Sequence, residues 1–443
     1  QPSSSRNPAS SARTRPVPLC VDMDGTLLNT DSLIECVFAL IKDWRALFAM
    51  VGWLLKGKAH LKQQLALHAR LDPALLPYNT GLLTWLHGQK RLGRRLILAT
   101  AADHVIADSV ARHLRIFDEV IASDGVNNLR GTAKAEAIDR HLGGQPYAYA
   151  GNDFSDLEIW RHADSAVLVN APKSVCKAAA EVTQIEAHVD DRAPWTRALL
   201  KALRPHQWVK NVLVLAAPLA AGNITDVSVL GSAGIAFVAF CLAASSIYLV
   251  NDAMDVESDR NHPTKRFRPI AAGVVPVTLA YVLAAVLLVG SIGIAFLANW
   301  QTAVVIAIYL VIQLGYCFGL KNQAVIDICI VSSGFLLRAI AGGVAAEIVL
   351  SQWFLLVMAF GSLFMAAGKR YAELQLAERT GAKIRKALEY YTTTYLRFVW
   401  TLSATAVVIF YGLWAFDKGD TNVAYAISMV PFTVAILRYA VDV

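Results

Sequence analysis

Hydrophobic and polar residues are distributed differently in the two halves of the chain. Up to about residue 195, short apolar runs that end in polar residues alternate with stretches of helical periodicity. This alternation predicts an α/β domain with a parallel, doubly wound sheet, whose chemistry lies at the carboxyl ends of the strands. The predicted strands are VPLCVDMD, RRLILATA, DEVIASD, PYAYAGND and SAVLVN, with a long helical region from about Asp31 to Gln89 after the first.

Part of that helical region is almost apolar enough to span a membrane. The stretch IECVFALIKDWRALFAMVGWLL carries charged residues in its middle, however. We therefore expect a helical cap on the α/β domain, lying on the membrane surface rather than crossing it.

The second half is dominated by long apolar segments. We count eight, at 207–222, 228–250, 275–297, 301–319, 325–346, 351–368, 396–415 and 423–441, and predict an all-α polytopic transmembrane bundle with about eight spans. Alternate loops between them are rich in Lys and Arg, which indicates that these loops and the preceding α/β domain face the cytoplasm. The predicted boundaries are a disordered basic arm at 1–16, the α/β domain at 17–188, a linker at 189–200 and the transmembrane domain at 201–443.

Composition agrees with a membrane protein. Hydrophobic residues make up 56 % of the chain and charged residues only 17 %. The net charge of +7 is explained by basic cytoplasmic loops, so we expect no nucleic-acid partner. The six cysteines are scattered without a CxxC pair, which argues against a zinc site or a disulfide framework.

Acidic residues follow the first predicted strand. In VDMDGTLL, Asp22 and Asp24 stand two residues apart, a pattern suited to an aspartyl nucleophile beside an acid/base aspartate. Attack by a carboxylate on a phosphoryl group requires Mg²⁺ and a further cation to offset the charge repulsion. Polar residues that could serve this chemistry follow later strands or begin later helices, namely Thr100, Lys134, Asp153 and Asp156.

These four stretches, in this order, resemble the haloacid dehalogenase (HAD) superfamily of phosphatases over residues 17 to 175. The resemblance implies a Rossmann-like fold in which Asp22 is the nucleophile and Asp24 the acid/base. It assigns Thr100 and Lys134 to the phosphate, and Asp22, Asp24, Asp153 and Asp156 to Mg²⁺. The family has an acid directly after the glycine of its fourth motif, where this chain has Asn152, so Asp153 is expected to substitute. A domain that kept the fold and lost turnover is the alternative.

A second acid-rich stretch, NDAMDVESDRNHPTKRFRPIAAG, lies between the second and third apolar segments. On a helix, Asp252, Asp255 and Asp259 share one face, and Asn251 joins Asp255. Oxygen ligands of this kind favour Mg²⁺, which completes its coordination with substrate phosphates. The bases that follow, Lys265, Arg266 and Arg268, are suited to phosphate oxygens, so the stretch predicts a diphosphate site. A solvated basic loop is the alternative, but it leaves the shared acidic face unexplained.

The NDxxDxxxD pattern resembles the UbiA-type prenyltransferase superfamily, over residues 198 to 443. Ordinary members join a prenyl diphosphate to an aromatic acceptor and carry a second DxxxD motif. Here Asp327 is present but Val331 stands four residues later, which argues against an ordinary prenyl-diphosphate donor.

Other stretches, among them RPHQWVKNVLVLAAPLAAG, QLGYCFGLKNQAV and GKRYAEL, resemble the decaprenyl-phosphate phosphoribosyltransferase branch of that superfamily. This resemblance implies 5-phosphoribosyl diphosphate as donor, a polyprenyl phosphate lipid as acceptor, Mg²⁺, and a location in the bacterial inner membrane. That branch has nine spans, so we expect the ninth to be missing from this sequence. Candidate substrate-binding residues are Lys210, Lys265, Arg266, Arg268, Asp327, Arg338, Lys369 and Arg370, with Asp327 as a candidate partner of Arg338.

Together the two resemblances predict a pair of consecutive reactions. The transferase would form a polyprenyl phosphate that carries ribose 5-phosphate, and the HAD domain would remove the 5-phosphate, giving a lipid-linked pentose donor for cell-envelope glycans. One alternative is an aromatic prenyltransferase with an unrelated phosphatase; another is a soluble domain with a non-catalytic role. Assembly into a homo-oligomer is compatible with the sequence, which contains nothing that decides it.

Overall fold

The computed structural model describes residues 16–40, 44–192, 194–380, 386–419 and 423–442. The chain divides into two compact units. The first unit comprises residues 1–198 together with 256–276, and the second comprises 199–255 together with 277–443. Residues 1–15, most of the predicted basic arm, lie outside the described residues.

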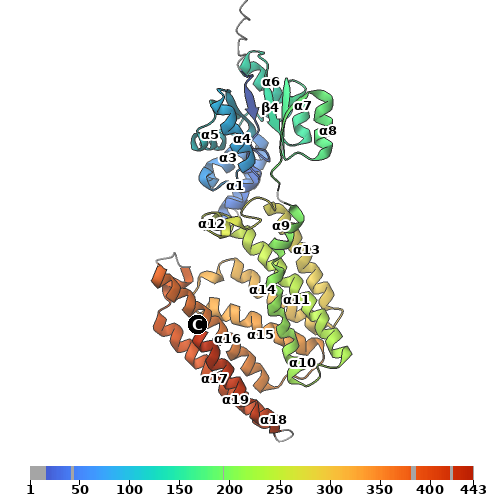
Figure 1. Cartoon of the computed structure of the whole chain (residues 1–443), viewed down its shortest axis with the longest axis vertical. Helices are drawn as coiled ribbons and strands as arrows, with labels where there is room; N and C mark the ends of the chain where they lie inside the picture. The colour runs from blue at the N-terminus through green and yellow to red at the C-terminus, as the bar shows by residue number, and fades with distance from the viewer. Residues whose placement is uncertain (1–15, 41–43, 193, 381–385, 420–422, 443) are drawn as a thin grey trace, which may run out of the picture. The chain divides into compact units, whose positions relative to one another are not determined.

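A six-stranded, fully parallel sheet forms the centre of the first unit (Figure 1). The strand order is β3-β2-β1-β4-β5-β6, with β1 (Leu19–Val21), β2 (Leu96–Asp103), β3 (Glu119–Ser123), β4 (Ala148–Gly151), β5 (Ser165–Val169) and β6 (Gln184–Val189). The five predicted strands are confirmed, and so is the parallel α/β fold. The edge strand β6 was not predicted, because only alternate residues of QIEAHV are half-buried.

The helices of the first unit cover both faces of the sheet. Alternate residues of β1 show why: Leu19 and Val21 belong to one buried core, while Cys20 belongs to the other. The helices are α1 (Ser32–Leu40), α2 (Trp44–Leu55), α3 (Lys58–Ala69), η1 (Pro73–Leu75), α4 (Thr80–Arg91), α5 (His104–Leu114), α6 (Thr132–Leu142), η2 (Phe154–Asp156), α7 (Leu157–Trp160), α8 (Lys173–Val182), α12 (Val256–Arg260) and η4 (Lys265–Phe267).

Helices α1 to α3 form the cap that the sequence predicts between β1 and β2. Several large apolar side chains of α2 are exposed, including Val51, Leu54 and Leu55. Contact of this helix with a membrane surface stays a prediction. None of the described helices of the first unit is long and apolar enough to cross a membrane.

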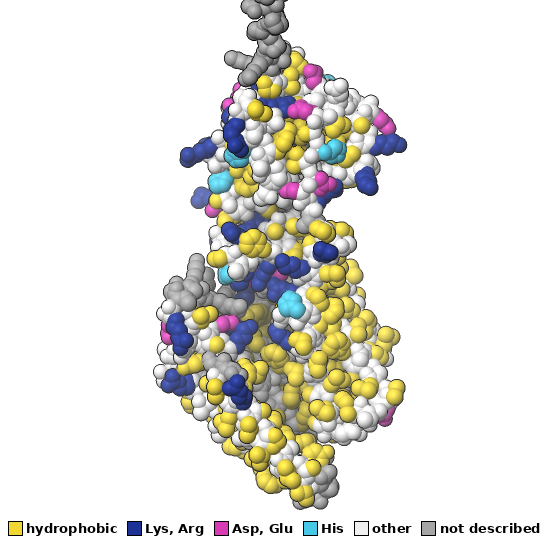
Figure 2. Space-filling view, viewed as in Figure 1, with side chains coloured by type: hydrophobic (Ala, Val, Ile, Leu, Met, Phe, Trp, Pro, Cys, Tyr) yellow, Lys and Arg dark blue, Asp and Glu magenta, His cyan; other side chains and the backbone are white. Residues whose placement is uncertain are grey.

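The second unit is a helical bundle (Figure 1). Its helices are η3 (Pro205–Leu215), α10 (Ala216–Ala220), α11 (Val227–Met254), α13 (Val277–Ala295), α14 (Trp300–Cys317), η5 (Leu320–Asn322), α15 (Ile326–Ala345), α16 (Gln352–Thr380), η6 (Lys386–Tyr390), α17 (Thr393–Gly419), α18 (Val423–Ile427) and α19 (Met429–Asp442), while α9 (Trp195–Leu203) crosses the boundary between the units. In the described residues, seven helical segments are long and apolar enough to span a membrane. Hydrophobic side chains dominate the face of this unit seen in Figure 2, and Lys and Arg gather around its upper part.

The first of the eight predicted spans differs from expectation. Residues 207–222 are divided between the 3-10 helix η3 and the five-residue helix α10. Pro218 lacks a backbone N–H group, and the polar side chains of Lys210 and Asn211 interrupt the apolar run, which explains why one long helix does not form. The other seven segments correspond to the seven long apolar helices.

Candidate active sites

A buried carboxylate and a buried amine meet at the carboxyl end of β1. Asp22 Oδ1 accepts a hydrogen bond of 2.8 Å from Nζ of Lys134, and the same Nζ donates to the Tyr149 hydroxyl at 2.9 Å. Burial alone would lower the pKa of Lys134, but Asp22 and Asp156 hold it above its ordinary value. Lys134 is therefore a fixed positive charge beside the carboxylate that the sequence predicts as nucleophile.

Asp24 is held by the first residue of the cap. Its carboxylate accepts hydrogen bonds from the Ser32 backbone N–H at 2.8 Å and from Ser32 Oγ at 3.1 Å. Burial, together with the charges of Asp31 and Asp22, raises the pKa of Asp24 to about 7, although the Ser32 hydrogen bonds lower it. A carboxyl group with this pKa exchanges protons readily near neutrality, as an acid/base catalyst requires.

The two acids of the fourth motif have different environments. Asp156 is buried and accepts hydrogen bonds from the backbone N–H groups of Asn152 and Asp153 and from the Tyr149 hydroxyl. Burial and the Asp22 charge raise the pKa of Asp156 to about 6, although Lys134 lowers it. Asp153 is exposed, and its carboxylate caps η2 by accepting from the Phe154 N–H at 2.7 Å.

Asn152 lies against the loop that carries the candidate residues Asp22 and Asp24. Its Oδ1 accepts a hydrogen bond of 3.2 Å from Thr26 Oγ1. Asn152, the residue that departs from the HAD pattern, thus faces the loop of Asp22 and Asp24. An amide oxygen is itself a usual ligand of divalent cations. We therefore consider Asn152 a better candidate than Asp153 for the missing acid.

Two further polar residues complete this end of the sheet. Thr100 is fully buried, and its Oγ1 accepts from the Ala102 N–H at 3.0 Å. Lys62, on cap helix α3, donates to the Ala101 carbonyl at 2.8 Å and to Asn128 Oδ1 at 2.9 Å. Burial lowers the pKa of Lys62, against the charges of Asp24 and Asp31. Sequence reasoning missed Lys62, because no pattern in a helical cap marks which lysine reaches the strand ends.

The charges of this first site suit a divalent cation. Beside burial, the charge of Asp22 raises the pKa of both Asp24 and Asp156, and Lys134 forms an ion pair with Asp22. No three acidic, histidine or cysteine side chains enclose a metal position in the described part of the chain. Mg²⁺ in phosphoryl-transfer sites is held by one or two carboxylates, waters and the substrate phosphate, so the donor set fits Mg²⁺ with phosphate present.

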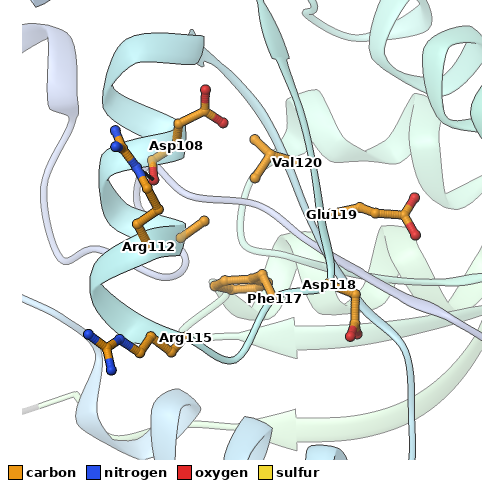
Figure 3. Close-up of a pocket in the computed structure, with 8 residues that line it drawn as sticks. Asp108, Arg112, Arg115, Phe117, Asp118, Glu119 and Val120 are labelled. Carbon is orange, nitrogen blue, oxygen red and sulfur yellow. Dashed lines mark hydrogen bonds between the residues drawn. The ribbon is translucent and has the colours of Figure 1, made fainter.

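A charged, open depression lies elsewhere on this unit (Figure 3). Asp108, Arg112 and Arg115 of the α5 region line it together with Phe117, Asp118, Glu119 and Val120. The last four are at the amino end of β3, whereas the catalytic candidates are at the carboxyl ends of strands. This depression is therefore not part of the candidate site.

The second unit contains two acids of the NDAMD stretch, each paired with a base. Asp252 is buried, and its two oxygens accept from one Arg204 nitrogen at 2.5 and 2.7 Å. Lys321 Nζ donates to both oxygens of Asp255, at 2.8 and 2.7 Å, and to Asn251 Oδ1 at 3.4 Å. Neither Arg204 nor Lys321 was predicted as a site residue, since both are distant from the motif in sequence.

The predicted continuous helical face of the acid motif is interrupted. Helix α11 ends at Met254, Asp255 caps it, and α12 begins at Val256. Asp259 belongs to the first unit, where it is buried and accepts from Arg268 NH1 at 2.6 Å. Lys265 and Arg266 lie in the neighbouring 3-10 helix η4, with the Arg266 guanidinium 4.9 Å from the Phe267 ring centre.

In the described part of the second unit, a group of cations has no carboxylate partner. Arg338 is buried and donates to Asn211 Oδ1 at 2.7 Å, to the Gly334 carbonyl and to the Tyr309 hydroxyl. The charges of Arg204, Arg338 and Lys369 lie near enough to Lys210 to repel it. Among the described residues, Lys210 and Lys369 form no hydrogen bond or ion pair. Such an excess of positive charge indicates a binding site for an anion.

Asp327 takes part in a closed buried network and is not the partner of Arg338. Its oxygens accept from Arg370 Nε at 2.8 Å and from the Tyr391 hydroxyl at 2.5 Å. Arg370 also binds Glu373 at 2.8 Å. The expected pairing with Arg338 was wrong, because Arg370 approaches Asp327 from helix α16. This network favours a structural role for Asp327 and Arg370.

Comparison with known proteins agrees with this geometry. The model of the UbiA prenyltransferase family matches residues 212–443, just over half of the chain. The chain belongs to the UbiA prenyltransferase family. This UbiA-family protein is 68 % identical over 259 residues to a decaprenyl-phosphate phosphoribosyltransferase of Mycolicibacterium smegmatis, and the match covers 55 % of this chain and 81 % of that protein.

A second relative matches both parts of the chain. An uncharacterized protein, y4nM, of Sinorhizobium fredii is 35 % identical over 366 residues, covering 82 % of this chain and 70 % of that protein. The first part also matches a HAD family hydrolase from Salmonella enterica serovar Typhi, with 14 % identity and a TM-score of 0.30 over 40 % of this chain and 69 % of that one. The UbiA-family part makes the protein a multi-pass membrane transferase, preceded by a parallel-sheet domain.

Proposed function

We propose that this protein transfers 5-phosphoribose from 5-phosphoribosyl diphosphate to a polyprenyl phosphate, and then removes the 5-phosphate from the lipid-linked product. The similarity to the phosphoribosyltransferase of M. smegmatis carries the first part of the proposal. The second part rests on the residues at the carboxyl ends of β1, β2 and β4.

The paired acids of α11 provide the donor side of the transferase site. Asn251, Asp252 and Asp255 would hold Mg²⁺; Asp259, which the motif also predicts as a ligand, belongs to the first unit. The metal would neutralise the leaving diphosphate. Arg204 and Lys321 neutralise the two carboxylates before the donor binds, and afterwards they can turn to diphosphate oxygens. Lys265, Arg266 and Arg268 stay predicted phosphate-binding residues of the same motif.

The unpaired cations provide the acceptor side. Lys210, Arg338 and Lys369 attract the lipid phosphate and hold one of its oxygens for attack on ribose C1. The bond from C1 to the diphosphate oxygen breaks as the new C1–O bond forms, and diphosphate leaves. Because the phosphate acceptor is already ionised, the reaction needs no general base.

The Asp327 network argues against the alternative of an aromatic prenyltransferase. Such an enzyme uses a second DxxxD motif, and this chain has Val331 at its last position. The remaining acid is engaged by Arg370 and Tyr391. A second metal clamp for a prenyl diphosphate is therefore unsupported.

The phosphatase step follows from the first site. Asp22 attacks the phosphorus of the ribose 5-phosphate ester, and the ester oxygen leaves with the proton of Asp24. Water, deprotonated by Asp24, then hydrolyses the aspartyl phosphate to phosphate and free Asp22. Lys134 and Thr100 hold phosphoryl oxygens. Mg²⁺ on Asp22, Asp24, Asp156 and Asn152 would offset the charge repulsion between nucleophile and phosphate.

Fusion of the two sites in one chain increases the effective concentration of the intermediate at the second site. We propose that both sites face the cytoplasm of the bacterial inner membrane, because the basic loops are on that side. The water-soluble donor would be available there.

The test supplies the purified protein in nanodiscs with polyprenyl phosphate, 5-phosphoribosyl diphosphate and Mg²⁺, and analyses the lipid by mass spectrometry. The wild type should give polyprenyl phosphoryl ribose, and Asp22→Asn should accumulate the form that retains the 5-phosphate. Asp252→Asn should give neither. Incorporation from a prenyl diphosphate instead would contradict the proposed transferase reaction.

A further inference from the structure

The chain segment between α11 and α13 is a structural part of the phosphatase unit. It follows one span and precedes another, yet residues 256–276 group with the first unit. The same segment carries the predicted phosphate-binding residues of the transferase. Its contacts within the first unit therefore show how residues 256–276 can position side chains of the candidate phosphatase site.

One contact is a buried, two-point ion pair. Arg260 NH1 and NH2 each donate to one oxygen of Glu35, both at 2.9 Å, and the third donor, Arg260 Nε, binds the Ala271 carbonyl at 3.0 Å. The exposed fractions are only 9 % for the Arg260 side chain and 8 % for that of Glu35. This planar two-point geometry fixes orientation as well as distance, and lysine cannot reproduce it.

Glu35 connects this ion pair with the turn that holds Asp24. Its Oε1 also accepts from Thr30 Oγ1 at 2.8 Å, and the Thr30 carbonyl accepts from the Gly25 N–H at 3.1 Å. Glu35 lies in the first turn of α1, whose first residue, Ser32, makes both hydrogen bonds to Asp24. Displacement of Glu35 would therefore move Gly25, which follows Asp24 in the chain, and also Ser32, which donates both hydrogen bonds to the Asp24 carboxylate.

A second contact packs Gly273 against the same 24–32 turn. Gly273, at φ +75°, packs so closely that a Cβ would come within 3.0 Å of the Asn29 carbonyl oxygen and of Pro77 Cβ. Asn29 stands between Asp24 and Thr30, and its N–H donates to the Pro77 carbonyl at 2.8 Å. The segment thus contacts the 24–32 turn directly at Asn29 and reaches it indirectly through Glu35, which binds Thr30.

We infer that Arg260 is a positioning residue for the phosphatase. Through Glu35 it holds the 24–32 turn so that Asp24 faces the ester oxygen, which leaves the phosphorus when Asp22 attacks. The inference rests on the proposed phosphatase activity. It makes the loop of the transferase a required part of the phosphatase site, and it gives a chemical reason for joining the two enzymes in one chain.

The experiment measures hydrolysis of ribose 5-phosphate by the full chain in nanodiscs, with Mg²⁺ and without lipid acceptor. Arg260→Gln and Glu35→Gln should each lower kcat by about 10-fold or more, with KM changed less than about 2-fold, because misplacement affects the chemical step. The double variant should lose no more than either single variant, since both remove the same interaction. Arg260→Lys should retain only part of the activity.

The control is Glu257→Gln, an exposed carboxyl on the same short helix, which should match the wild type. The reversed pair, Glu35→Arg with Arg260→Glu, should recover activity over the single variants, which a general folding defect would not allow. Three results would overturn the positioning role. They are an unchanged kcat in both single variants, a kcat in the double variant reduced by the product of the two single losses, and a kcat of Glu257→Gln that falls as much as those of the single variants. If the wild type does not hydrolyse ribose 5-phosphate, or if Asp22→Asn leaves its hydrolysis unchanged, the proposed phosphatase and this inference are overturned together.

Discussion

The two candidate sites use acidic residues in opposite ways. In the first unit, Asp22, Asp24 and Asp156 lie together beside the ammonium of Lys134, and burial raises the pKa values of Asp24 and Asp156 to about 7 and about 6. In the second unit, Asp252 and Asp255 each have a basic partner, Arg204 and Lys321. Lys210, Arg338 and Lys369 then remain as additional positive charge.

The difference corresponds to the anions that each site would handle. A phosphatase binds one phosphate and must supply a nucleophile, so an excess of carboxylates that share a cation suits it. A transferase that binds a diphosphate and a lipid phosphate must hold two anions at once, and an excess of bases suits that task. Charge balance therefore distinguishes the two sites even though both begin with an aspartate motif.

The largest expected effect separates the two reactions. Asp22→Asn removes the nucleophile and should lower hydrolysis of ribose 5-phosphate at least about 10³-fold, while phosphoribosyl transfer to lipid stays within about 2-fold of the wild type. Asp252→Asn should do the reverse. The two rates are measured by phosphate release and by radiolabel transfer from donor to lipid.

Asp164→Asn serves as the control for both, because this exposed carboxyl is at the start of β5, away from the strands' carboxyl ends. Loss of both reactions in either Asp22→Asn or Asp252→Asn would mean that the sites do not act separately.

A smaller effect should follow removal of the unpaired cations. Lys210→Met and Lys369→Met should each lower kcat/KM for polyprenyl phosphate by about 10- to 100-fold, the usual value of a hydrogen bond to a charged group. Phosphatase activity should not change. The exposed Lys201→Met is the matched control. If the two variants instead affect only the KM for 5-phosphoribosyl diphosphate, the cations belong to the donor side.

The Asp327 network predicts an effect on stability. Arg370→Met leaves the buried Asp327 carboxylate without its cation, and we expect a cost of about 3–5 kcal/mol, seen as a lower apparent Tm of the bundle in detergent. Transfer per folded molecule should stay within about 3-fold of the wild type. An unchanged Tm combined with lost transfer would show that Arg370 binds substrate, as the sequence first indicated.

The smallest effect concerns the edge strand β6. Glu186 accepts from Arg94 NH2 at 2.9 Å, and this hydrogen bond is the main cause of the lowered pKa of Glu186. Since its pKa falls on folding, Glu186 stabilises the first unit at pH values above its ordinary 4.5, and this contribution is lost as the pH falls through the lower folded value. Glu186→Gln should cost about 1–3 kcal/mol at pH 7 and progressively less in acid.

Hydrogen exchange of the β5 and β6 amides at pH 7 and in acid would measure this cost. Exposed Glu181→Gln is the control. A cost that is the same at both pH values would contradict the ion-pair explanation, and neither active site should be affected.

Short-range patterns explain what could be predicted from the sequence. Buried strands followed by polar residues specify the parallel sheet, and a parallel sheet brings its carboxyl ends to one edge. This pattern therefore predicted the fold, whereas the assignment of Lys134, which binds Asp22 from helix α6, came from the resemblance to the HAD motifs. Span lengths likewise predicted the helical bundle, apart from the segment 207–222, which is divided between η3 and α10 and contains Pro218.

Pairings between distant elements could not be predicted in this way. Arg204 and Lys321 reach the acids of α11 from separate elements, and Arg370 reaches Asp327 from another helix. Whether Asn152 or Asp153 is the candidate metal ligand depends on the backbone conformation after β4. Two adjacent polar residues in the sequence do not reveal that conformation. The Glu35–Arg260 pair joins residues 225 positions apart.

The most direct test of the two-step account is the mass of the lipid formed by Asp22→Asn compared with the wild type, from polyprenyl phosphate and 5-phosphoribosyl diphosphate with Mg²⁺. The account predicts that the variant's product is heavier than that of the wild type by one phosphate group, with equal molar yield. Identical products in the two proteins would contradict the account.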